Sequence, residues 1–317
     1  MNYPSKHKLR LQYAEVETQK NWDALILNFL ANLEVSSFSK FQYSKRLEQF
    51  KSFLLNEQIF SPERKDLLKF KSVLKEKNLQ SNTIGAYFVP IRLLFEWTEI
   101  NRIYPNIAAG IKGAKRPKGF RRDSLTISQV HQLMDSISRS EVKGKRDFAL
   151  INLLIRTGLR TVEVIRCKIG SIRPVSSDTI GLWVQGKGHE EADEFVILTE
   201  ECVGPIMDYI ATRGSLNQES PLFASLSDGS YGNSLSTRTI RRVVKERLRS
   251  AGLSNPMYSS HGLRHTSVTL SLAGGASIQE AQKMARHADI STTTIYAHNI
   301  DRAKGVAERS IENILKR

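Results

Sequence analysis

Residues 261–265 read His-Gly-Leu-Arg-His, and residues 285–296 read Ala-Arg-His-Ala-Asp-Ile-Ser-Thr-Thr-Thr-Ile-Tyr. Two shorter segments precede them: residues 157–163 read Thr-Gly-Leu-Arg-Thr-Val-Glu, and residues 186–188 read Gly-Lys-Gly. Each segment alone is common in unrelated proteins. The ordered set is more informative, because it supplies six side chains suited to one reaction: Arg160, Lys187, His261, Arg264, His287 and Tyr296.

The chemistry that these side chains share is the transfer of a phosphodiester. Arg160 and Arg264 can bind the phosphate oxygens, whose negative charge spreads in the transition state, with fixed forks of donors. Tyr296 can attack as a nucleophile and form a covalent phosphate ester. Lys187 can protonate the leaving 5′ oxygen, and the histidines can take the tyrosine proton or donate to the phosphate. Such a reaction depends on positioning and charge, so we expect neither a metal nor a cofactor.

The ordered set resembles the catalytic signature of the tyrosine recombinases, the family of phage integrases, Cre and the bacterial Xer recombinases. The resemblance covers residues 124–317 by motif and residues 19–111 more weakly, by layout. It implies a mainly α fold with a small β hairpin or sheet. In this family a helical, SAM-like core-binding domain and a catalytic domain form a C-shaped clamp around DNA.

By matching position, the resemblance implies six catalytic residues and two supporting ones. The catalytic set is Arg160, Lys187, His261, Arg264, His287 and Tyr296, and the supporting residues are Glu163 and His265. The two arginines would hold the phosphate, while Tyr296 would attach to the DNA 3′ phosphate. Lys187 would be the general acid, His261 would assist proton transfer, and His287 would donate a hydrogen bond to the phosphate.

The sequence departs from the family pattern at two places. The family usually reads Leu-Gly-His where residues 285–287 read Ala-Arg-His, so we expect Arg286 to add a DNA contact or to alter a tight helix junction. The family hairpin usually continues with lysine and arginine after Gly-Lys-Gly, but residues 189–194 read His-Glu-Glu-Ala-Asp-Glu. These acids either hold the loop away from DNA until assembly or belong to a solvated turn.

The charge balance independently favours a polyanionic partner. The chain of 317 residues contains 47 Lys and Arg against 32 Asp and Glu, which gives a net charge of +15 and a pI near 9.8. Cations placed on phosphates release condensed counterions, so nucleic acid is the favoured partner. Composition alone leaves open contact with ribosomes, an anionic membrane, or simple solubility.

Several other classes of protein are disfavoured. Cys167 and Cys202 are far apart and form no CxxC motif, which argues against a disulfide framework or a zinc site. His261 and His265 have metal-ligand spacing, but no glutamate follows the first histidine as in HExxH. No run of about 18 apolar residues predicts a membrane span, and residues 1–18 lack the pattern of a signal peptide. We therefore expect a cytoplasmic, nucleoid-associated protein.

The chain divides into four predicted segments: a leader at 1–18, a helical DNA-binding domain at 19–111, a basic linker at 112–123 and a catalytic domain at 124–317. So short a leader resembles the simple Xer-like layout. The linker cations are expected to lie along a phosphate backbone, with a soluble spacer as the alternative; they are Lys115, Arg116, Arg121 and Arg122. In the first domain we expect four helices, the third capped by Ser61 with Pro62 as its first residue.

The catalytic domain is predicted to mix helices with one hairpin. Helices are expected at 126–138, 145–157, 200–213, 237–250, 262–273, 277–286, 291–297 and 302–316, and strands at 179–185 and 194–198. Helix 237–250 is expected to enter a DNA groove through Arg238, Arg241, Arg242 and Lys245, although a solvated face is the alternative. The apolar stripe of the helix at 302–317 would dock on a neighbouring subunit or pack on its own domain.

These observations predict a site-specific DNA recombinase that acts through a 3′-phosphotyrosyl intermediate. Its partner would be double-stranded DNA with paired inverted-repeat sites, bound as a dimer per site and a homotetramer on two duplexes, with room for an accessory protein. Two alternatives stay open: a catalytically silent DNA-binding accessory protein, and a type IB topoisomerase or telomere resolvase.

Overall fold

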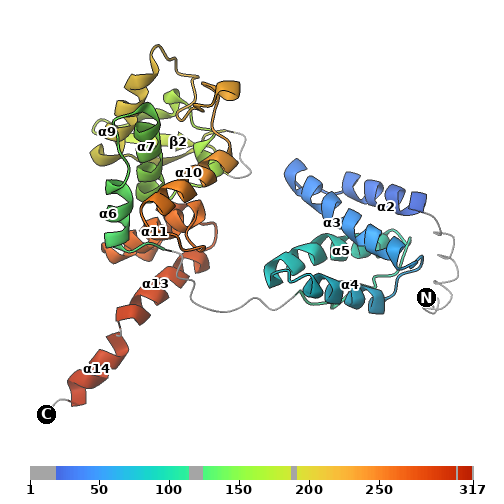
Figure 1. The fold of residues 1–317 in the computed structure, drawn as a ribbon. Helices are drawn as coiled ribbons and strands as arrows, with labels where there is room; N and C mark the ends of the chain where they lie inside the picture. The colour runs from blue at the N-terminus through green and yellow to red at the C-terminus, as the bar shows by residue number, and fades with distance from the viewer. Residues whose placement is uncertain (1–18, 114–123, 187–190, 305, 316–317) are drawn as a thin grey trace. The chain divides into compact units, whose positions relative to one another are not determined.

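A computed structural model describes residues 19–113, 124–186, 191–304 and 306–315. The predicted leader, Lys187 and the four linker cations lie outside these residues. The chain divides into two compact units, Met1–Gly119 and Phe120–Arg317 (Figure 1). Each unit has its own buried core, and the mainly α fold with a small sheet is as predicted.

The first unit consists of four helices around an aromatic core. The helices are α2 (Gln19–Ala31), α3 (Ser37–Asn56), α4 (Arg64–Glu76) and α5 (Ser81–Ile100). The ring of Phe50 on α3 contacts one ring from each of the other three: Trp22 on α2, Phe70 on α4 and Phe95 on α5. Aromatic rings bury large areas and favour such edge contacts, so Phe50 joins all four helices at one point.

The predicted start of α4 is wrong. Ser61 does not cap this helix, which begins at Arg64 after Glu63 as N-cap. The Ser61 hydroxyl pairs instead with the Tyr104 hydroxyl at 3.1 Å, and the Tyr104 hydroxyl also donates to the Pro62 carbonyl at 2.8 Å. A long-range contact therefore overrides the local Ser-Pro signal. The Glu63 N–H is satisfied by the Asp66 carboxylate at 2.7 Å, within the first turn.

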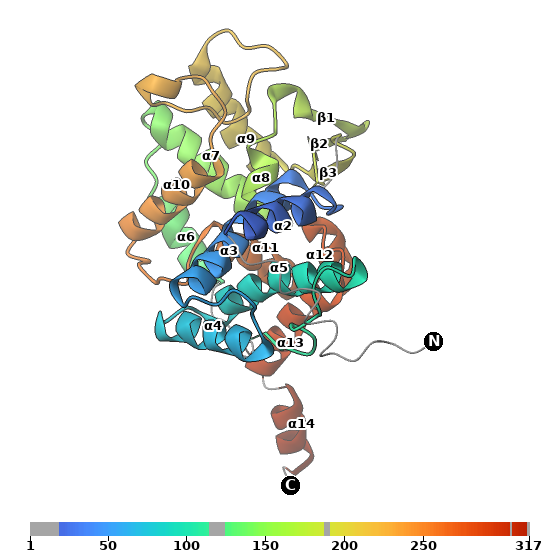
Figure 2. The same ribbon diagram turned by 90° about the vertical axis from the view of Figure 1, so that its right-hand side faces the viewer.

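The second unit contains most of the helices and the sheet (Figure 2). Its helices are α6 (Ile127–Asp135), α7 (Val142–Thr157), α8 (Thr161–Val164), α9 (Glu200–Ile210), α10 (Thr237–Ser250), α11 (Ser260–Ala273), α12 (Ile278–Ala285), α13 (Ser291–Lys304) and α14 (Val306–Leu315). Its strands are β1 (Ile172–Ser176), β2 (Thr179–Val184) and β3 (Glu194–Ile197), antiparallel in the order β1-β2-β3. None of the described helices is long and apolar enough to cross a membrane.

Two features of this unit differ from expectation. The predicted hairpin is extended by β1, an edge strand that contains Pro174, and proline is tolerated at an edge because it need not donate to the ladder. Helix α13 continues to Lys304 instead of ending at residue 297. The sequence of residues 298–304 contains neither glycine nor proline, so nothing local interrupts the helix there.

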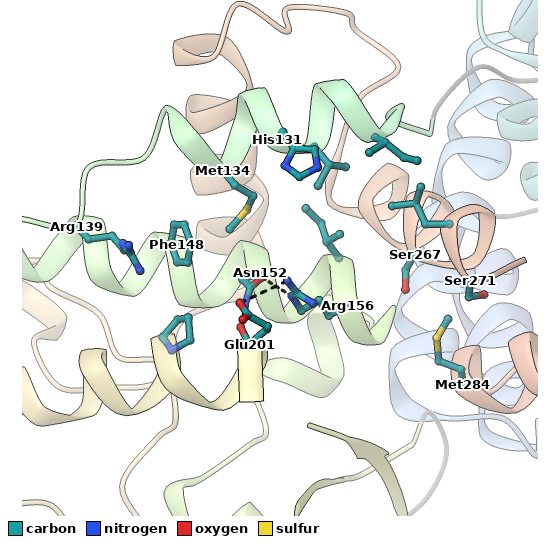
Figure 3. Close-up of a pocket in the computed structure, with 15 residues that line it drawn as sticks. His131, Met134, Arg139, Phe148, Asn152, Arg156, Glu201, Ser267, Ser271 and Met284 are labelled. Carbon is teal, nitrogen blue, oxygen red and sulfur yellow. Dashed lines mark hydrogen bonds and ion pairs between the residues drawn. The ribbon is translucent and has the colours of Figure 1, made fainter. Parts of the chain in front are cut away.

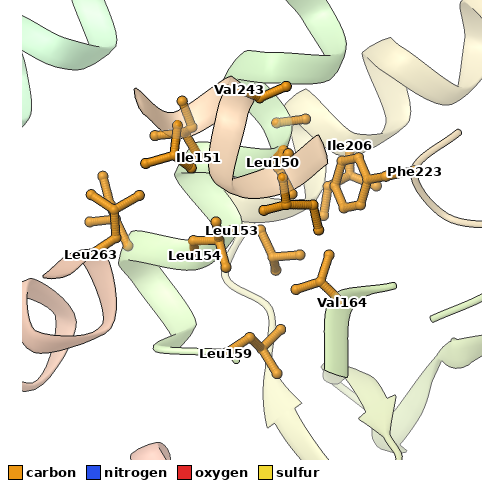
Figure 4. Packing of buried hydrophobic residues seen from close by; sticks show 14 of the residues in the cluster. Leu150, Ile151, Leu153, Leu154, Leu159, Val164, Ile206, Phe223, Val243 and Leu263 are labelled. Atoms are coloured by element: carbon orange, nitrogen blue, oxygen red, sulfur yellow. The ribbon is translucent and has the colours of Figure 1, made fainter. Parts of the chain in front are cut away.

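Helix α7 lies at the centre of the second unit. Leu150, Leu153 and Leu154 are fully buried, and the core around them draws side chains from α8, α9, α10 and α11 (Figure 4). Eleven of the 16 residues of α7 are buried, as expected for a helix that other elements surround on most sides. The helix ends at Gly158, and this end directs the chain into the segment that contains Arg160.

A buried carboxylate joins α7 to α10. The Asp147 carboxylate accepts from Arg247 Nε at 2.9 Å and Nη2 at 2.7 Å, and its other oxygen accepts from Arg146 Nε at 3.0 Å and Nη2 at 2.7 Å. Two-donor pairing of this kind fixes orientation as well as distance. The network therefore holds α10 with its apolar stripe on the core and its cations outward.

Candidate active site

The first motif along the chain, residues 157–163, contains a left-handed turn at Gly158 that leads into the site. Gly158 has φ of 63°, and a Cβ at this position would lie 3.2 Å from the Ser267 hydroxyl oxygen, so glycine fits best. The turn exposes the Gly158 carbonyl, which accepts from Arg264 Nη1 at 2.6 Å. It also places Arg160 at the N-cap of α8. The first and third motifs are thus in direct contact.

Arg264 on α11 is almost completely buried. One Nη donates to the Gly158 carbonyl, and the other donates to the Ala285 carbonyl at the end of α12. Burial, and then the neighbouring charge of Arg160, lower the pKa of Arg264 to about 10. The guanidinium is still charged at neutral pH, and a charge buried at this cost is held in one orientation by its acceptors.

Arg160 is held beside Arg264 but is one third exposed. Its Nη1 donates to Glu163 Oε1 at 2.8 Å, and its Nη2 donates to the Arg286 carbonyl at 3.2 Å. Arg160 and Arg264 thus bind two consecutive carbonyls, of residues 285 and 286, where α12 ends. The last carbonyls of a helix have no partner within it and attract cations, so this helix end aligns both guanidiniums next to His287.

Glu163 is fully buried and has three donors. The backbone N–H of Arg160 donates to Oε2 at 2.6 Å, Arg160 Nη1 donates to Oε1, and Arg286 Nη2 donates to Oε2 at 2.6 Å. Burial raises the pKa of Glu163, but the charge of Arg286 and the contacts with Arg160 outweigh it and leave the pKa below its usual value. The carboxylate is therefore ionised and balances part of the surrounding positive charge.

His287 follows the end of α12 and is held by its neighbours. Its Nδ1 lies 2.9 Å from the Thr293 hydroxyl oxygen, and its carbonyl accepts from the Gln282 side chain at 3.0 Å. Burial, followed by the charges of Arg264 and Arg160, lowers the pKa of His287 to about 4. The imidazole is therefore neutral at physiological pH. In the tautomer whose Nδ1 accepts from Thr293, Nε2–H is the donor that a phosphate contact requires.

The remaining predicted residues come from two helices. His261 and His265 lie one turn apart on α11, and Tyr296 lies on α13. The Nε2 atoms of His261 and His265 are 3.0 Å apart. The centroids of the Tyr296 and His265 rings are 5.2 Å apart, and the two ring planes make an angle of 64°. His265, predicted as a supporting residue, thus contacts both His261 and the tyrosine. Among the described residues no group of three or more His, Cys, Asp or Glu is arranged to hold a metal ion.

Sequence reasoning missed the contacts of Arg286. The structure places it at the C-cap of α12 with its side chain on Glu163, which fits the expected change in the helix junction. The only available signal was the departure from Leu-Gly-His. Beside the site is a cavity of about 750 Å³ with a lining that includes Gly186, Asp193, Glu194 and Lys283 as well as Arg160, Arg286 and His287. Lys187, the sixth predicted catalytic residue, lies outside the described residues.

The predicted DNA-binding cations of α10 form a separate basic surface. Arg238, Arg241, Arg242 and Lys245 are exposed, and they line a shallow hollow of about 680 Å³. The apolar positions of the same helix are buried in the core. Within the helix, Arg242 has an i,i+4 ion pair with Glu246 at 3.9 Å, a contact that stabilises little at the surface.

A further cavity, of about 610 Å³, lies between α6, α7, α9, α11 and α12 (Figure 3). Its walls are mostly apolar and include Phe148 and Met284. His131 and Arg156 add polar groups at the edge, and Arg156 Nε donates to the Asn152 side chain at 2.9 Å. None of the five predicted catalytic residues that the structure describes lines this cavity.

Comparison with known proteins agrees with this geometry. The phage integrase family model matches residues 123–302. The tyrosine recombinase slr0733 of Synechocystis is 26% identical over 234 residues, which are 74% of this chain and 73% of that protein. The tyrosine recombinase XerD of Rickettsia bellii is 26% identical over 283 residues, which are 85% of this chain and 90% of that protein.

Solved structures show the same fold at low sequence identity. XerH site-specific recombinase bound to palindromic difH substrate has a TM-score of 0.69 at 19% identity, covering 95% of this chain and 94% of that one. A lambda integrase tetramer bound to a Holliday junction has a TM-score of 0.68 at 15% identity, covering 93% and 81%. From the family match and the arrangement of its motifs, the chain belongs to the phage integrase family, the tyrosine recombinases that its sequence resembles.

Proposed function

We propose that this protein is a site-specific DNA recombinase that cuts and rejoins strands through a covalent bond between Tyr296 and a DNA 3′ phosphate. The observation that supports this most directly is that five of the predicted catalytic residues lie close together in the structure. Arg160 and Arg264 bind consecutive carbonyls at the end of α12, and His287 follows at once in the chain. Tyr296 contacts His265, which pairs with His261 on the same α11 that bears Arg264.

The proposed cleavage step uses these groups together. The Tyr296 oxygen attacks phosphorus, the new P–O bond forms, and the bond to the 5′ oxygen breaks. The tyrosine proton passes to the neighbouring His265 and His261 pair, while Lys187 protonates the 5′ oxygen as it leaves. Arg160 and Arg264 bind the phosphate oxygens, whose charge spreads in the transition state. Attack by a 5′ hydroxyl of the partner duplex reverses these steps and joins the exchanged strands.

The reaction needs no external energy source, because the phosphotyrosyl ester keeps the free energy of the broken phosphodiester. The phosphodiester energy is kept in the ester to Tyr296 and returned at rejoining, so the proposal needs neither a nucleotide nor a metal. Among the alternatives, a catalytically silent accessory protein is disfavoured because every catalytic position of the signature is filled. A topoisomerase or telomere resolvase would use the same cleavage chemistry and differ only in its products.

A nicked suicide substrate tests the catalytic proposal. The cognate site is first selected from random duplexes with the Tyr296→Phe variant, and is then nicked close to the cut so that rejoining is blocked. We expect a covalent protein–DNA adduct with the wild-type chain and none with the variant at equal DNA binding. Absence of an adduct on a tightly bound site would refute the proposal. Recombinant junctions, rather than relaxed circles or hairpin ends, would identify a recombinase.

We further propose that the protein works as a dimer on each inverted-repeat site and as a homotetramer on two duplexes at the nucleoid. On α14, the side chains of Ile311, Ile314 and Leu315 are exposed, although they are apolar. Such a stripe is suited to a neighbouring subunit, and the cavity of Figure 3, with its apolar walls, is the receptor that we propose. An accessory protein is compatible with this assembly but is not required by it.

A truncation tests the assembly. A chain that ends before Arg302 retains all the predicted catalytic residues, so we expect it to bind single sites but to lose tetrameric complexes on two duplexes. Native gels and light scattering on preassembled DNA would show the loss. A matched control replaces Ser310 and Glu312 with alanine, which leaves the apolar stripe of α14 intact. Undiminished tetramers in the truncated chain would contradict the role of this segment.

A further inference from the structure

Arg286 occupies a backbone conformation that arginine does not favour. It is the C-cap of α12, with φ of 53° and ψ of 50°, in the left-handed region. Glycine adopts this conformation without strain, whereas an L side chain brings its Cβ close to the backbone. The strain of an arginine at this position is offset by contacts that its side chain makes and that glycine could not make.

The contacts of Arg286 join three parts of the site. Its Nη2 donates to the buried Glu163 carboxylate at 2.6 Å, and its backbone carbonyl accepts from Arg160 Nη2 at 3.2 Å. Its Nε lies 3.6 Å from the carboxylate of Glu194, the first residue of β3. Arg286 therefore contacts both functional residues of the first motif and the strand beside them.

Each nitrogen of the Arg286 guanidinium has its own protein contact, and two of these contacts are ion pairs with carboxylates. Its side chain is only 7% exposed, and its Nη1 donates to the Met284 carbonyl at 3.0 Å. Arg160, which lines the same cavity as Arg286, is 33% exposed in its side chain. Arg286 is thus placed to act on a phosphate through Arg160, with which it shares the Glu163 carboxylate.

We propose that Arg286 is a positioning residue for strand cleavage. It holds the Glu163 carboxylate on one oxygen while Arg160 binds the other, and it accepts from Arg160 through its own carbonyl. Arg160 is thereby fixed from two sides, with its guanidinium directed to where the phosphate would bind. Through Glu194 the same side chain links β3 to this arrangement. The proposal rests on the proposed recombinase function for its catalytic consequence, but the orientation of Arg160 can be measured without it.

Arg286→Gly separates positioning from folding. Glycine relieves the backbone strain, but the buried Glu163 loses one of its three donors. We therefore expect a lower melting temperature but an unchanged circular dichroism spectrum below the unfolding transition. The single-turnover cleavage rate at saturating DNA should fall by about 100-fold, the order of effect that a small misplacement of a catalytic group produces. The Kd for DNA should change by less than about threefold, since Arg286 does not bind the phosphate.

A matched control and a conservative variant narrow the interpretation. Arg102 is also an arginine in the left-handed region, with φ of 59°, but it lies in the first unit. Arg102→Gly removes the same charge and the same kind of strain, and should leave the cleavage rate unchanged. Arg286→Lys retains a single donor for Glu163 and should recover part of the rate lost in Arg286→Gly.

A readout without catalysis makes the inference independent. Selectively ¹⁵N-labelled arginine side chains can be followed by NMR, with the Arg160 resonance assigned through Arg160→Lys. We expect Arg286→Gly to increase the mobility of the Arg160 guanidinium, and Arg102→Gly to leave it unchanged. An unchanged Arg160 signal and cleavage rate in Arg286→Gly would overturn the inference. If Arg160 becomes mobile in Arg286→Gly but the wild-type protein forms no covalent adduct with DNA, the positioning inference stands and the proposed recombinase function is refuted.

Discussion

Two groups of arginines in the second unit differ in almost every physical respect. Around the end of α12, Arg160, Arg264 and Arg286 bind carbonyls and one buried carboxylate, and two of the three are nearly inaccessible. On α10, Arg238 and Arg241 belong to a row of exposed cations on one face of a helix. The first group is fixed by protein acceptors, whereas the second faces solvent.

The difference matches two demands that DNA makes on a protein. A phosphate in its transition state needs donors that are already oriented, because reorientation during the reaction would cost free energy. Contacts along a duplex backbone need charge more than fixed geometry, and they weaken as salt rises. We therefore expect substitutions in the α12 group to act mainly on rate, and substitutions on α10 to act mainly on binding and its salt dependence.

The largest expected effect is that of Arg264→Lys. An ammonium cannot reach both the Gly158 and Ala285 carbonyls as a guanidinium does. We expect cleavage to slow by about 10³-fold, as when an oriented donor to a developing anion is lost. The same substitution at Arg238, where charge rather than geometry matters, should slow cleavage by less than about threefold. Single-turnover rates at saturating DNA measure both, and equal losses would remove the distinction.

A second prediction concerns Asp147, which joins the core to α10. Asp147→Ala leaves the buried Arg146 guanidinium without its carboxylate, so we expect a loss of about 3–5 kcal/mol in the free energy of unfolding. Denaturant unfolding of the whole chain would measure it. The exposed Asp135, at the end of α6, provides the control, since Asp135→Ala should cost less than about 0.5 kcal/mol. Similar values for the two variants would show that α10 is not anchored through Asp147.

A third prediction concerns the salt dependence of binding. Arg241→Ala removes one exposed cation of α10, so we expect the slope of log K against log salt to fall by about 1. The cleavage rate at saturating DNA should be unchanged. Fluorescence anisotropy across a range of salt concentrations measures the slope. A variant that lost rate without losing slope would place Arg241 in the chemistry rather than in binding.

The smallest expected effect is a pH dependence due to His287. Its pKa in the folded chain is about 4, against 6.5 ordinarily, so between these values the unfolded chain binds a proton that the folded chain excludes. Stability from this residue is therefore complete above pH 6.5 and is lost as the pH falls towards 4. His287→Asn should flatten the fall of the melting temperature in that window. His131→Asn, at a histidine outside the cluster, serves as the control and should leave the pH dependence of the melting temperature unchanged. If the melting temperatures of the wild type and His287→Asn fell equally with pH, His287 would not be the source of this dependence.

The sequence predicted the catalytic neighbourhood better than it predicted the contacts within it. Motif order alone indicated that Arg160, Arg264 and His287 would meet, because a shared reaction requires it. The pairing of Arg286 with Glu163 joins residues 123 positions apart, and a contact at that separation produces no sequence periodicity from which it could be predicted. Ser61 failed as a cap for a related reason, since a distant tyrosine competed for it. The roles of Lys187 and the linker cations remain predictions.

Helix α7 gives the second unit a fixed length between its two basic groups. Asp147, near its start, anchors α10, and Gly158, directly after its end, binds Arg264. The roughly ten residues between these points span about 15 Å at about 1.5 Å per residue. One buried helix therefore fixes the separation between the arginine cluster at the end of α12 and the point where the basic helix α10 is anchored.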